Sequence, residues 1–320
     1  MSSDLSPFNA TGWILPDDRT SEMHACHAEW KAETPFFGEI NGGVGDIPDN
    51  FLLYDLEIKA TGGLLPRIGQ VEGSCVGVSD ERSSMQAACG DAVLRGDEEY
   101  VTPGFPFPTW GIGRQLGGLR GRGAGSFGGA QAKARKQWGG VAFDDPNIPK
   151  PVSTKNGWLF WSSKIELDYS WPPSWPGDRE ALTAEAANHQ YETTTQIGSI
   201  DELRSLLSQG YGCTMACDFG TRPKVIDGYL VGDWNLSWAH QQSISGYHTH
   251  PNLGLLFAID NQWGPDAHPP CPLLSKLGVY GSYWIRESVM KKIIQTGEVI
   301  GRSASEGFPV RPPDWRLVWA

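Results

Sequence analysis

Residues 69–78 read Gly-Gln-Val-Glu-Gly-Ser-Cys-Val-Gly-Val, and a cysteine here follows two small residues at the start of a predicted helix. The helical pattern continues for about 20 residues, through Leu94. A thiol attacks acyl carbons only as the thiolate, and the positive end of a helix dipole favours that anion. The small residues Gly73 and Ser74 allow a substrate to approach the backbone closely. This stretch therefore makes Cys75 a candidate nucleophile.

A base and an orienting group for such a thiol occur later in the chain. His240 lies in the strand-like segment Ala239-His-Gln-Gln-Ser-Ile-Ser-Gly-Tyr247, and Asn261 lies in Asp260-Asn-Gln-Trp-Gly264. Imidazole suits proton transfer near neutral pH, and an amide oxygen can fix the plane of its ring. The backbone N–H of Cys75 and the Gln70 amide are candidate donors to a developing oxyanion. A lone cysteine is usually a buried small hydrophobe, so the hypothesis depends on all of these residues together.

Composition limits the classes of protein to consider. The 320 residues include 26 Lys and Arg against 37 Asp and Glu, and the net charge of −11 argues against a general nucleic-acid binder. The 14 Trp and 12 Phe indicate a packed globular protein. With 40 Gly and 23 Pro, about a fifth of the chain, helical bundles and coiled coils are excluded.

Helical patterns dominate the first half of the chain and strand patterns the second. Besides the helix after Cys75, helices are predicted at 130–138 and, from the Ser199 and Glu202 capping pair, at 199–207. The segments predicted to be extended are 51–58, 213–219, 237–247 and 254–259, and those predicted to be irregular or loop-rich are 1–48, 102–129 and 144–188.

The segments around Cys75, His240 and Asn261 resemble the corresponding motifs of the papain-like cysteine proteases. Gln…Gly-Ser-Cys, His followed six residues later by Gly-Tyr, and Asn-x-Trp-Gly occur here in that family's chain order. The resemblance implies an α+β, two-lobed papain-like fold with a substrate cleft between a helical lobe and a bent antiparallel sheet or barrel. Its boundaries would be an irregular N-terminal arm at 1–48 and a papain-like domain at 49–320. The domain would comprise a helical lobe at about 64–165, a β lobe at about 190–300 and a C-terminal tail at 301–320.

The same resemblance implies a role for each site residue. Cys75 would be the nucleophile, His240 the base, Asn261 the orienting group and Gln70 an oxyanion donor. Trp263 would shield the bond between His240 and Asn261, and the glycine-rich loop, with Gly123 and Gly125, would contact the substrate backbone.

The chain also departs from the family pattern. Gln70 precedes Cys75 by five residues rather than the usual six, and Val76 stands where the family has Trp. Gln262 replaces the family's Ser. No stretch reads as the long helical inhibitory prosegment of the secreted enzymes, and residues 1–48 are expected to dock on the body of the protein or on other chains of an assembly.

Other features have simpler interpretations. His248 and His250, and the cluster of His24, Cys26 and His27, lack the four paired ligands of a zinc site, so no metal or other cofactor is expected. Cys213 and Cys217 are predicted to be core thiols. The six basic residues between 114 and 136 are expected to form a solvated face, and the four Trp at 158–175 to serve in packing or an interface.

Three functions fit these observations. The first is a thiol peptidase that acts on a peptide or protein through a Cys75 acyl-enzyme. The second is a structural or docking component of a larger assembly such as a bacteriophage virion, suggested by the long loops rich in Trp and Pro. The third is a cell-wall amidase with the same chemistry. No apolar run of 18 residues and no signal-like start occur, so the expected location is the cytoplasm or a virion.

Overall fold

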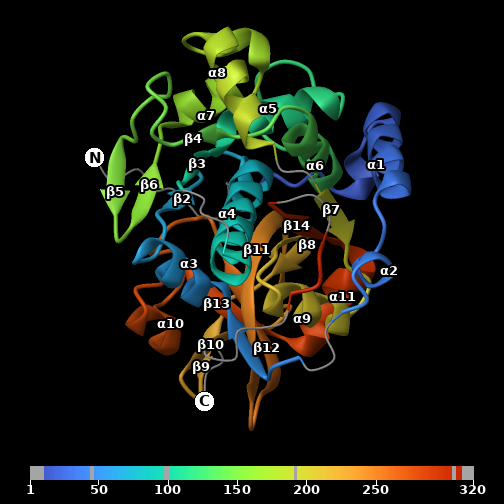
Figure 1. The fold of residues 1–320 in the computed structure, drawn as a ribbon, viewed down its shortest axis with the longest axis vertical. Helices are drawn as coiled ribbons and strands as arrows, with labels where there is room; N and C mark the ends of the chain where they lie inside the picture. Colours follow the sequence, from blue (N-terminus) through green and yellow to red (C-terminus); the bar gives the residue numbers. More distant parts are fainter. Residues whose placement is uncertain (1–10, 44–46, 97–100, 191–192, 305–307, 312–320) are drawn as a thin grey trace.

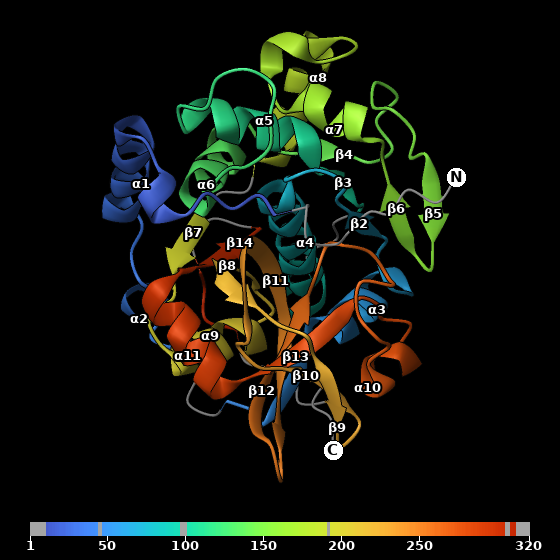
Figure 2. The same ribbon diagram turned by 180° about the vertical axis from the view of Figure 1, so that it is seen from behind.

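A computed structural model describes residues 11–43, 47–96, 101–190, 193–304 and 308–311. Its architecture is α+β (Figures 1 and 2). The helices are α1 (Ser21–Glu33), α2 (Phe37–Ile40), α3 (Leu53–Thr61), α4 (Cys75–Gly90), α5 (Pro106–Leu116), α6 (Gly128–Gln137), α7 (Ser163–Tyr169), α8 (Arg179–Ala186), α9 (Ile200–Ser208), α10 (Pro272–Lys276) and α11 (Glu287–Thr296).

The strands fall into one large sheet and two small ones. The large sheet comprises β1 (Asn50–Leu52), β7 (Thr193–Gln196), β8 (Gly212–Gly220), β9 (Lys224–Ile226), β10 (Tyr229–Gly232), β11 (Leu236–His250), β12 (Gly254–Asp260), β13 (Ser282–Arg286) and β14 (Glu298–Ser303). The small sheets comprise β2 (Arg67–Gly69), β5 (Ser153–Lys155) and β6 (Trp158–Phe160), and β3 (Gly104–Phe105) with β4 (Val141–Ala142).

The large sheet is open, with the order β7-β14-β8-β11-β12-β13-β10-β9, and β1 pairs with β11. Its pairs are antiparallel except β10 with β13, which is parallel. The helix α4 lies at the centre of the molecule, between the sheet and the helices α5 to α8 (Figure 1). The sequence thus brings its predicted nucleophile helix against its longest strand, β11.

Each of the two parts of the molecule has its own large hydrophobic core. The larger core packs α3, α9 and α11 on the sheet, with Leu206, Phe257 and Trp284 among its fully buried members. The second core lies among α5, α7 and α8 and includes Phe107 and Trp161. Aromatic side chains fill the second core in edge-to-face pairs, as between Phe105 and Phe107 with ring centroids 5.1 Å apart.

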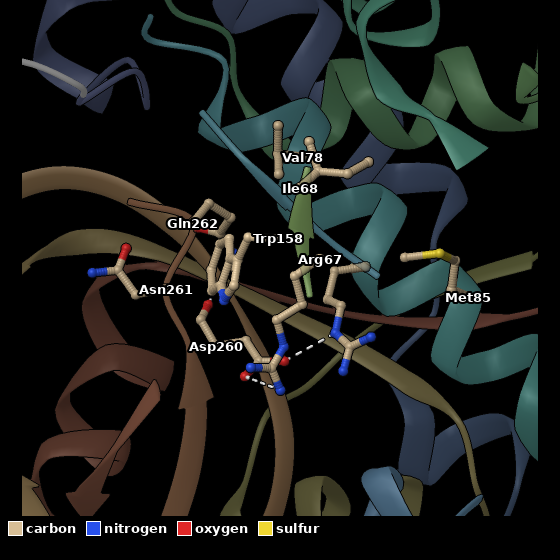
Figure 3. A pocket seen from close by; sticks show the side chains of 9 residues that line it. Arg67, Ile68, Val78, Met85, Trp158, Asp260, Asn261 and Gln262 are labelled. Carbon is tan, nitrogen blue, oxygen red and sulfur yellow. Dashed lines mark hydrogen bonds and ion pairs between the residues drawn. The ribbon is translucent and has the colours of Figure 1, made fainter. Parts of the chain in front are cut away.

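A buried network of charges ties α4 to the end of β12 (Figure 3). Arg82, two turns after Cys75, donates from Nε to Asp260 at 2.9 Å and from a terminal nitrogen to Glu57 at 2.5 Å. Arg67 lies 3.7 Å from the same Asp260 carboxylate, and Tyr54 donates to it at 2.6 Å. Asp260 directly precedes Asn261, so the network fixes the position of Asn261 relative to α4.

Several local predictions are confirmed. The helix that starts at Cys75 is α4, the helix at 199–207 is α9, and the hydroxyl of Ser199 accepts the Glu202 N–H as a cap. The predicted strands at 213–219, 237–247 and 254–259 lie within β8, β11 and β12. Cys213 and Cys217 are buried, and all six cysteines are free thiols.

Other local predictions are wrong. The arm is not irregular throughout, because α1 starts at the Thr20 cap and runs to Glu33. The segment 51–58 is not extended throughout. Its first two residues end β1 (Asn50–Leu52), and the rest lies in α3, which begins at Leu53. The stretch 102–129 contains α5, which begins with Pro106 at a position where a missing N–H costs nothing. Helices also occur within 144–188, as α7 and α8.

The basic stretch at 114–136 is not simply a solvated face. Arg114 and Arg135 are both buried, and Arg135 pairs with Asp80 at 2.9 Å. None of the helices in the described part of the chain combines the length and the apolar run needed to cross a membrane.

We expect Arg82→Ala to lower the free energy of unfolding by about 3–5 kcal/mol, because it leaves Glu57 buried without its counter-charge and Asp260 with only the more distant Arg67. Urea denaturation measures the effect. The control is Arg286→Ala, which removes a partly exposed pair with Asp233 and should cost at most about 1 kcal/mol. Equal losses in the two variants would contradict the role assigned to the network.

Candidate active site

Cys75 is the first residue of α4 and is completely buried. The loop that leads to it is held by Glu166 of α7, whose carboxylate accepts the N–H groups of Val71 (2.7 Å) and Glu72 (3.0 Å) and the Ser74 hydroxyl (2.7 Å). Burial raises the pKa of Glu166 to about 7, against the lowering effect of these hydrogen bonds. The carboxylate thus acts as the acceptor that fixes the backbone just before the nucleophile.

His240 lies within β11, and Asn261 directly follows the end of β12. The ring Nε2 of His240 is 3.0 Å from the Asn261 side-chain oxygen, and the Asn261 amide nitrogen is 2.8 Å from Nε2 of His268. An amide oxygen can only accept, so His240 carries its proton on Nε2 and leaves Nδ1 as the basic nitrogen. Trp263 stacks on the His240 ring with centroids 4.7 Å apart.

The strand β11, which carries His240, contacts the start of α4 through the next residue, Gln241. The backbone N–H of Gln241, the next residue, lies close enough to the Cys75 thiol to lower its pKa. The Gln241 side chain also donates to the Val76 carbonyl of α4 at 3.3 Å. The pairing of β11 with β8 is irregular between Ser237 and His240, which leaves the Ala239 carbonyl outside the regular ladder.

The freed Ala239 carbonyl is occupied by the N-terminal arm. We call residues 11–19 the covering segment. The N–H groups of Gly12 and Trp13 both donate to the Ala239 carbonyl at 3.1 Å. On the other side, Gly12 accepts the Ser126 N–H at 2.8 Å. A Cβ atom on Gly12 would lie 2.0 Å from the Gly73 carbonyl oxygen, so only glycine fits at this position. The covering segment therefore crosses the site directly over Cys75.

Burial shifts the pKa values of both Cys75 and His240. Burial raises the pKa of Cys75 to about 12, although the N–H groups of Gln241 and Gly12 lower it. Burial also lowers the pKa of His240 to about 4. Within the described residues, Nδ1 of His240 makes no hydrogen bond. The covered site therefore holds a neutral thiol and a neutral imidazole, and burial outweighs the helix dipole expected to favour the thiolate.

The remaining residues proposed from the sequence have different surroundings. Gln70 is buried, and its side-chain nitrogen donates to the Glu72 carbonyl at 3.0 Å. Gly125 lies beside the residues that precede Cys75, and its N–H donates to the Gly73 carbonyl at 2.9 Å. Gly123 instead donates to the Ser170 hydroxyl at 3.0 Å and lines a surface hollow beside α7. No group of three potential metal ligands occurs in the part of the chain that the structure describes.

Sequence reasoning missed several residues of the site. His268 follows Asn261 by seven residues but belongs to no recognisable motif. Glu166 and Gly12 are brought to the site only by long-range packing. The one available signal was the glycine at position 12 beside a tryptophan in an otherwise polar start, and that signal is weak.

We expect Gly12→Val to expose Cys75, because the added side chain cannot fit against Gly73 and must displace the covering segment or the loop beneath it. Alkylation of Cys75 by iodoacetamide, followed by peptide mapping, should become at least tenfold faster than in the unmodified protein. Gly63→Val is the matched control, since a Cβ there meets no atom within 4 Å. Labelling of Cys75 that stays as slow as that of the buried Cys89 would show that the segment does not limit access.

Comparison with known proteins gives structural neighbours only. No family model matches the sequence, and no curated protein matches it. Among solved structures, the cysteine protease xylellain from Xylella fastidiosa aligns with a TM-score of 0.60 at 14% identity, covering 93% of this chain and 97% of the other. Digestive procathepsin L 3 from Tenebrio molitor larval midgut aligns at 0.51 and 10% identity, covering 93% and 77%. The ragweed allergen Amb a 11, a cysteine protease in its proform, aligns at 0.51 and 12% identity, covering 95% and 79%. The chain therefore has a divergent papain-like fold with an α+β, two-lobed architecture.

Proposed function

We propose that this chain is a cysteine peptidase that hydrolyses peptide bonds through an acyl-enzyme on Cys75, with His240 as base and Asn261 as the orienting residue. The observation that carries the proposal is the hydrogen bond between His240 and Asn261. Trp263 stacks on the His240 ring, and the backbone N–H of the next residue on the strand, Gln241, contacts the Cys75 thiol. The cysteine proteases among the structural neighbours support the same class of reaction.

The proposed reaction uses Nδ1 of His240 as its base. This nitrogen takes the Cys75 proton, and the resulting thiolate attacks the substrate carbonyl carbon. The oxyanion is stabilised by the Cys75 N–H and, after rotation away from the Glu72 carbonyl, by the Gln70 amide. Collapse of the intermediate breaks the C–N bond, and the leaving amine takes the proton from His240. A water molecule, deprotonated by the same imidazole, then hydrolyses the thioester.

The covering segment must leave before this reaction can occur. The segment donates hydrogen bonds to the Ala239 carbonyl and packs against Gly73. A substrate backbone would have to lie in this same place. Its departure would also admit water and remove the burial that keeps Cys75 and His240 neutral. We therefore propose that the described form is resting and that displacement of residues 11–19 activates it.

No observation specifically supports the two other functions, a structural or docking component of an assembly and a cell-wall amidase. The described part of the arm packs on its own chain, with Trp13, Met23 and Trp30 buried against the body. No feature of the cleft favours a peptidoglycan amide over an ordinary peptide. The proposed peptidase remains the function that the geometry supports best, and the division into an arm at 1–48 and a domain at 49–320 remains part of the proposal.

We expect the Gly12→Val protein to hydrolyse fluorescein-labelled casein, and Cys75→Ala in the same protein to reduce the rate at least 1,000-fold, since the covalent step is lost. Cys89→Ala is the matched control, because it removes a buried thiol from the same helix and should change the rate less than threefold. Undiminished hydrolysis after Cys75→Ala, with the fold intact by circular dichroism, would contradict the proposed nucleophile.

A further inference from the structure

A second imidazole is hydrogen-bonded to the orienting residue of the proposed site. His268 lies seven residues after Asn261, and its Nε2 is 2.8 Å from the Asn261 amide nitrogen. The amide oxygen of the same side chain is 3.0 Å from Nε2 of His240. His240, Asn261 and His268 therefore form a chain of two hydrogen bonds, in which one amide connects two imidazole rings.

The direction of these two hydrogen bonds fixes the proton on each ring. An amide oxygen accepts and an amide nitrogen donates, so Nε2 of His240 carries a proton and Nε2 of His268 does not. Burial lowers the pKa of His268 to about 4, so near pH 7 its ring is neutral and its proton is on Nδ1. The same arrangement leaves Nδ1 of His240 unprotonated, and this is the nitrogen that the proposed reaction uses as its base.

A half-turn of the Asn261 amide would give the opposite arrangement. The amide nitrogen would donate to Nε2 of His240, whose proton would have to be on Nδ1, and His240 could then not act as a base there. With the observed tautomers, a half-turn alone would set the amide N–H against the N–H of His240. It would also leave the amide oxygen facing an unprotonated nitrogen of His268. His268 therefore opposes the half-turn at the second end of the amide, in addition to His240 at the first.

Packing holds the His268 ring where it can accept from Asn261. The ring contacts Tyr283 edge-on with centroids 4.9 Å apart, and its centroid is 6.5 Å from that of Trp263, which also stacks on His240. His268 is 8% exposed and Asn261 is completely buried. A buried amide N–H without an acceptor is costly. The acceptor at position 268 thus stabilises one orientation of the Asn261 side chain.

We propose that His268 is a positioning residue, which holds the Asn261 amide in the orientation that lets His240 act as a base. The inference rests on the proposed peptidase function and adds to it a residue outside the set of Cys75, His240 and Asn261. When the reaction protonates His240 on Nδ1, its Nε2–H still donates to the Asn261 oxygen, so a neutral His268 is compatible with a charged His240. Both rings cannot be charged together with these bonds intact, because each would donate from Nε2 and only the oxygen can accept.

The first experiment determines the tautomers in the unmodified full-length protein, labelled with nitrogen-15 histidine. Protonated and unprotonated ring nitrogens differ in chemical shift, and His240→Gln and His268→Gln assign the two rings. Near pH 7 we expect the proton on Nε2 of His240 and on Nδ1 of His268. In His268→Leu, which removes the acceptor, the population of the Nδ1–H tautomer of His240 should rise at least tenfold. His268→Gln should retain the original His240 tautomer, because its side-chain oxygen can accept the same N–H.

The second experiment measures hydrolysis of a quenched fluorescent peptide by the full-length Gly12→Val protein. Adding His268→Leu should lower kcat at least tenfold and change KM less than threefold, since His268 acts on the base and not on the substrate. Adding His268→Gln instead should keep kcat within threefold of the parent. His189→Leu is the matched control in both experiments, because it makes the same substitution at an exposed histidine and should change neither tautomer nor kcat.

The outcomes separate the two proposals. A proton on Nε2 of His268 in the unmodified protein, or a His240 tautomer that His268→Leu leaves unchanged, would overturn the role of His268 while hydrolysis by Gly12→Val still supported the peptidase. A loss of kcat that His268→Gln does not recover would also overturn it. The expected tautomers and their change in His268→Leu, with no peptide cleaved by Gly12→Val, would support the positioning role and contradict the peptidase.

Discussion

The buried ion pair between Arg82 and Asp260 is the contact on which the rest of the site depends. Arg82 is on the helix that begins at Cys75, and Asp260 directly precedes Asn261, so one guanidinium connects the nucleophile's helix to the orienting residue. Tyr54, Ser245 and Ser282 also donate to the Asp260 carboxylate. The positive charges of Arg67 and Arg82 hold the pKa of Asp260 well below its usual range, against the raising effect of burial. The carboxylate therefore stays ionised throughout the physiological range, and the two halves of the site keep a fixed separation.

In this form, the exclusion of water sets the protonation states of Cys75 and His240, rather than the arrangement of the residues around them. The hydrogen bond between His240 and Asn261 is present in this form, but a buried thiol and a buried imidazole favour their neutral forms. The covering segment contributes to this burial through Gly12, and it neutralises Glu298 through Arg19. One short segment thus contacts the residues around Cys75 through Gly12 and pairs with a buried carboxylate through Arg19.

Local signals predicted those parts of the structure that local sequence determines. The helix at Cys75, the Ser199 cap and the strands carrying His240 and the residues before Asn261 each follow from a short pattern, and their chain order indicated the fold. The failures share a physical cause. Pro106 and the glycines around it read as a loop, yet α5 is stabilised by burial of Phe107 and Trp110 in an aromatic core. Glu166 reaches the site through a hydrogen bond between residues 95 positions apart, and His268 reaches it from a loop with no recognisable motif, so no periodicity encodes either. The position of the covering segment depends on the same long-range packing.

The most direct test of the central claim is a chemical measurement of whether Cys75 and His240 meet in the open cleft. The Gly12→Val protein is treated with 1,3-dibromoacetone, whose first bromide the Cys75 sulfur displaces and whose second an adjacent ring nitrogen can displace. The account predicts a single cross-linked peptide pair containing Cys75 and His240, identified by mass spectrometry and absent in the His240→Gln variant. Alkylation of Cys75 without a link to His240 would contradict the convergence on which the account rests.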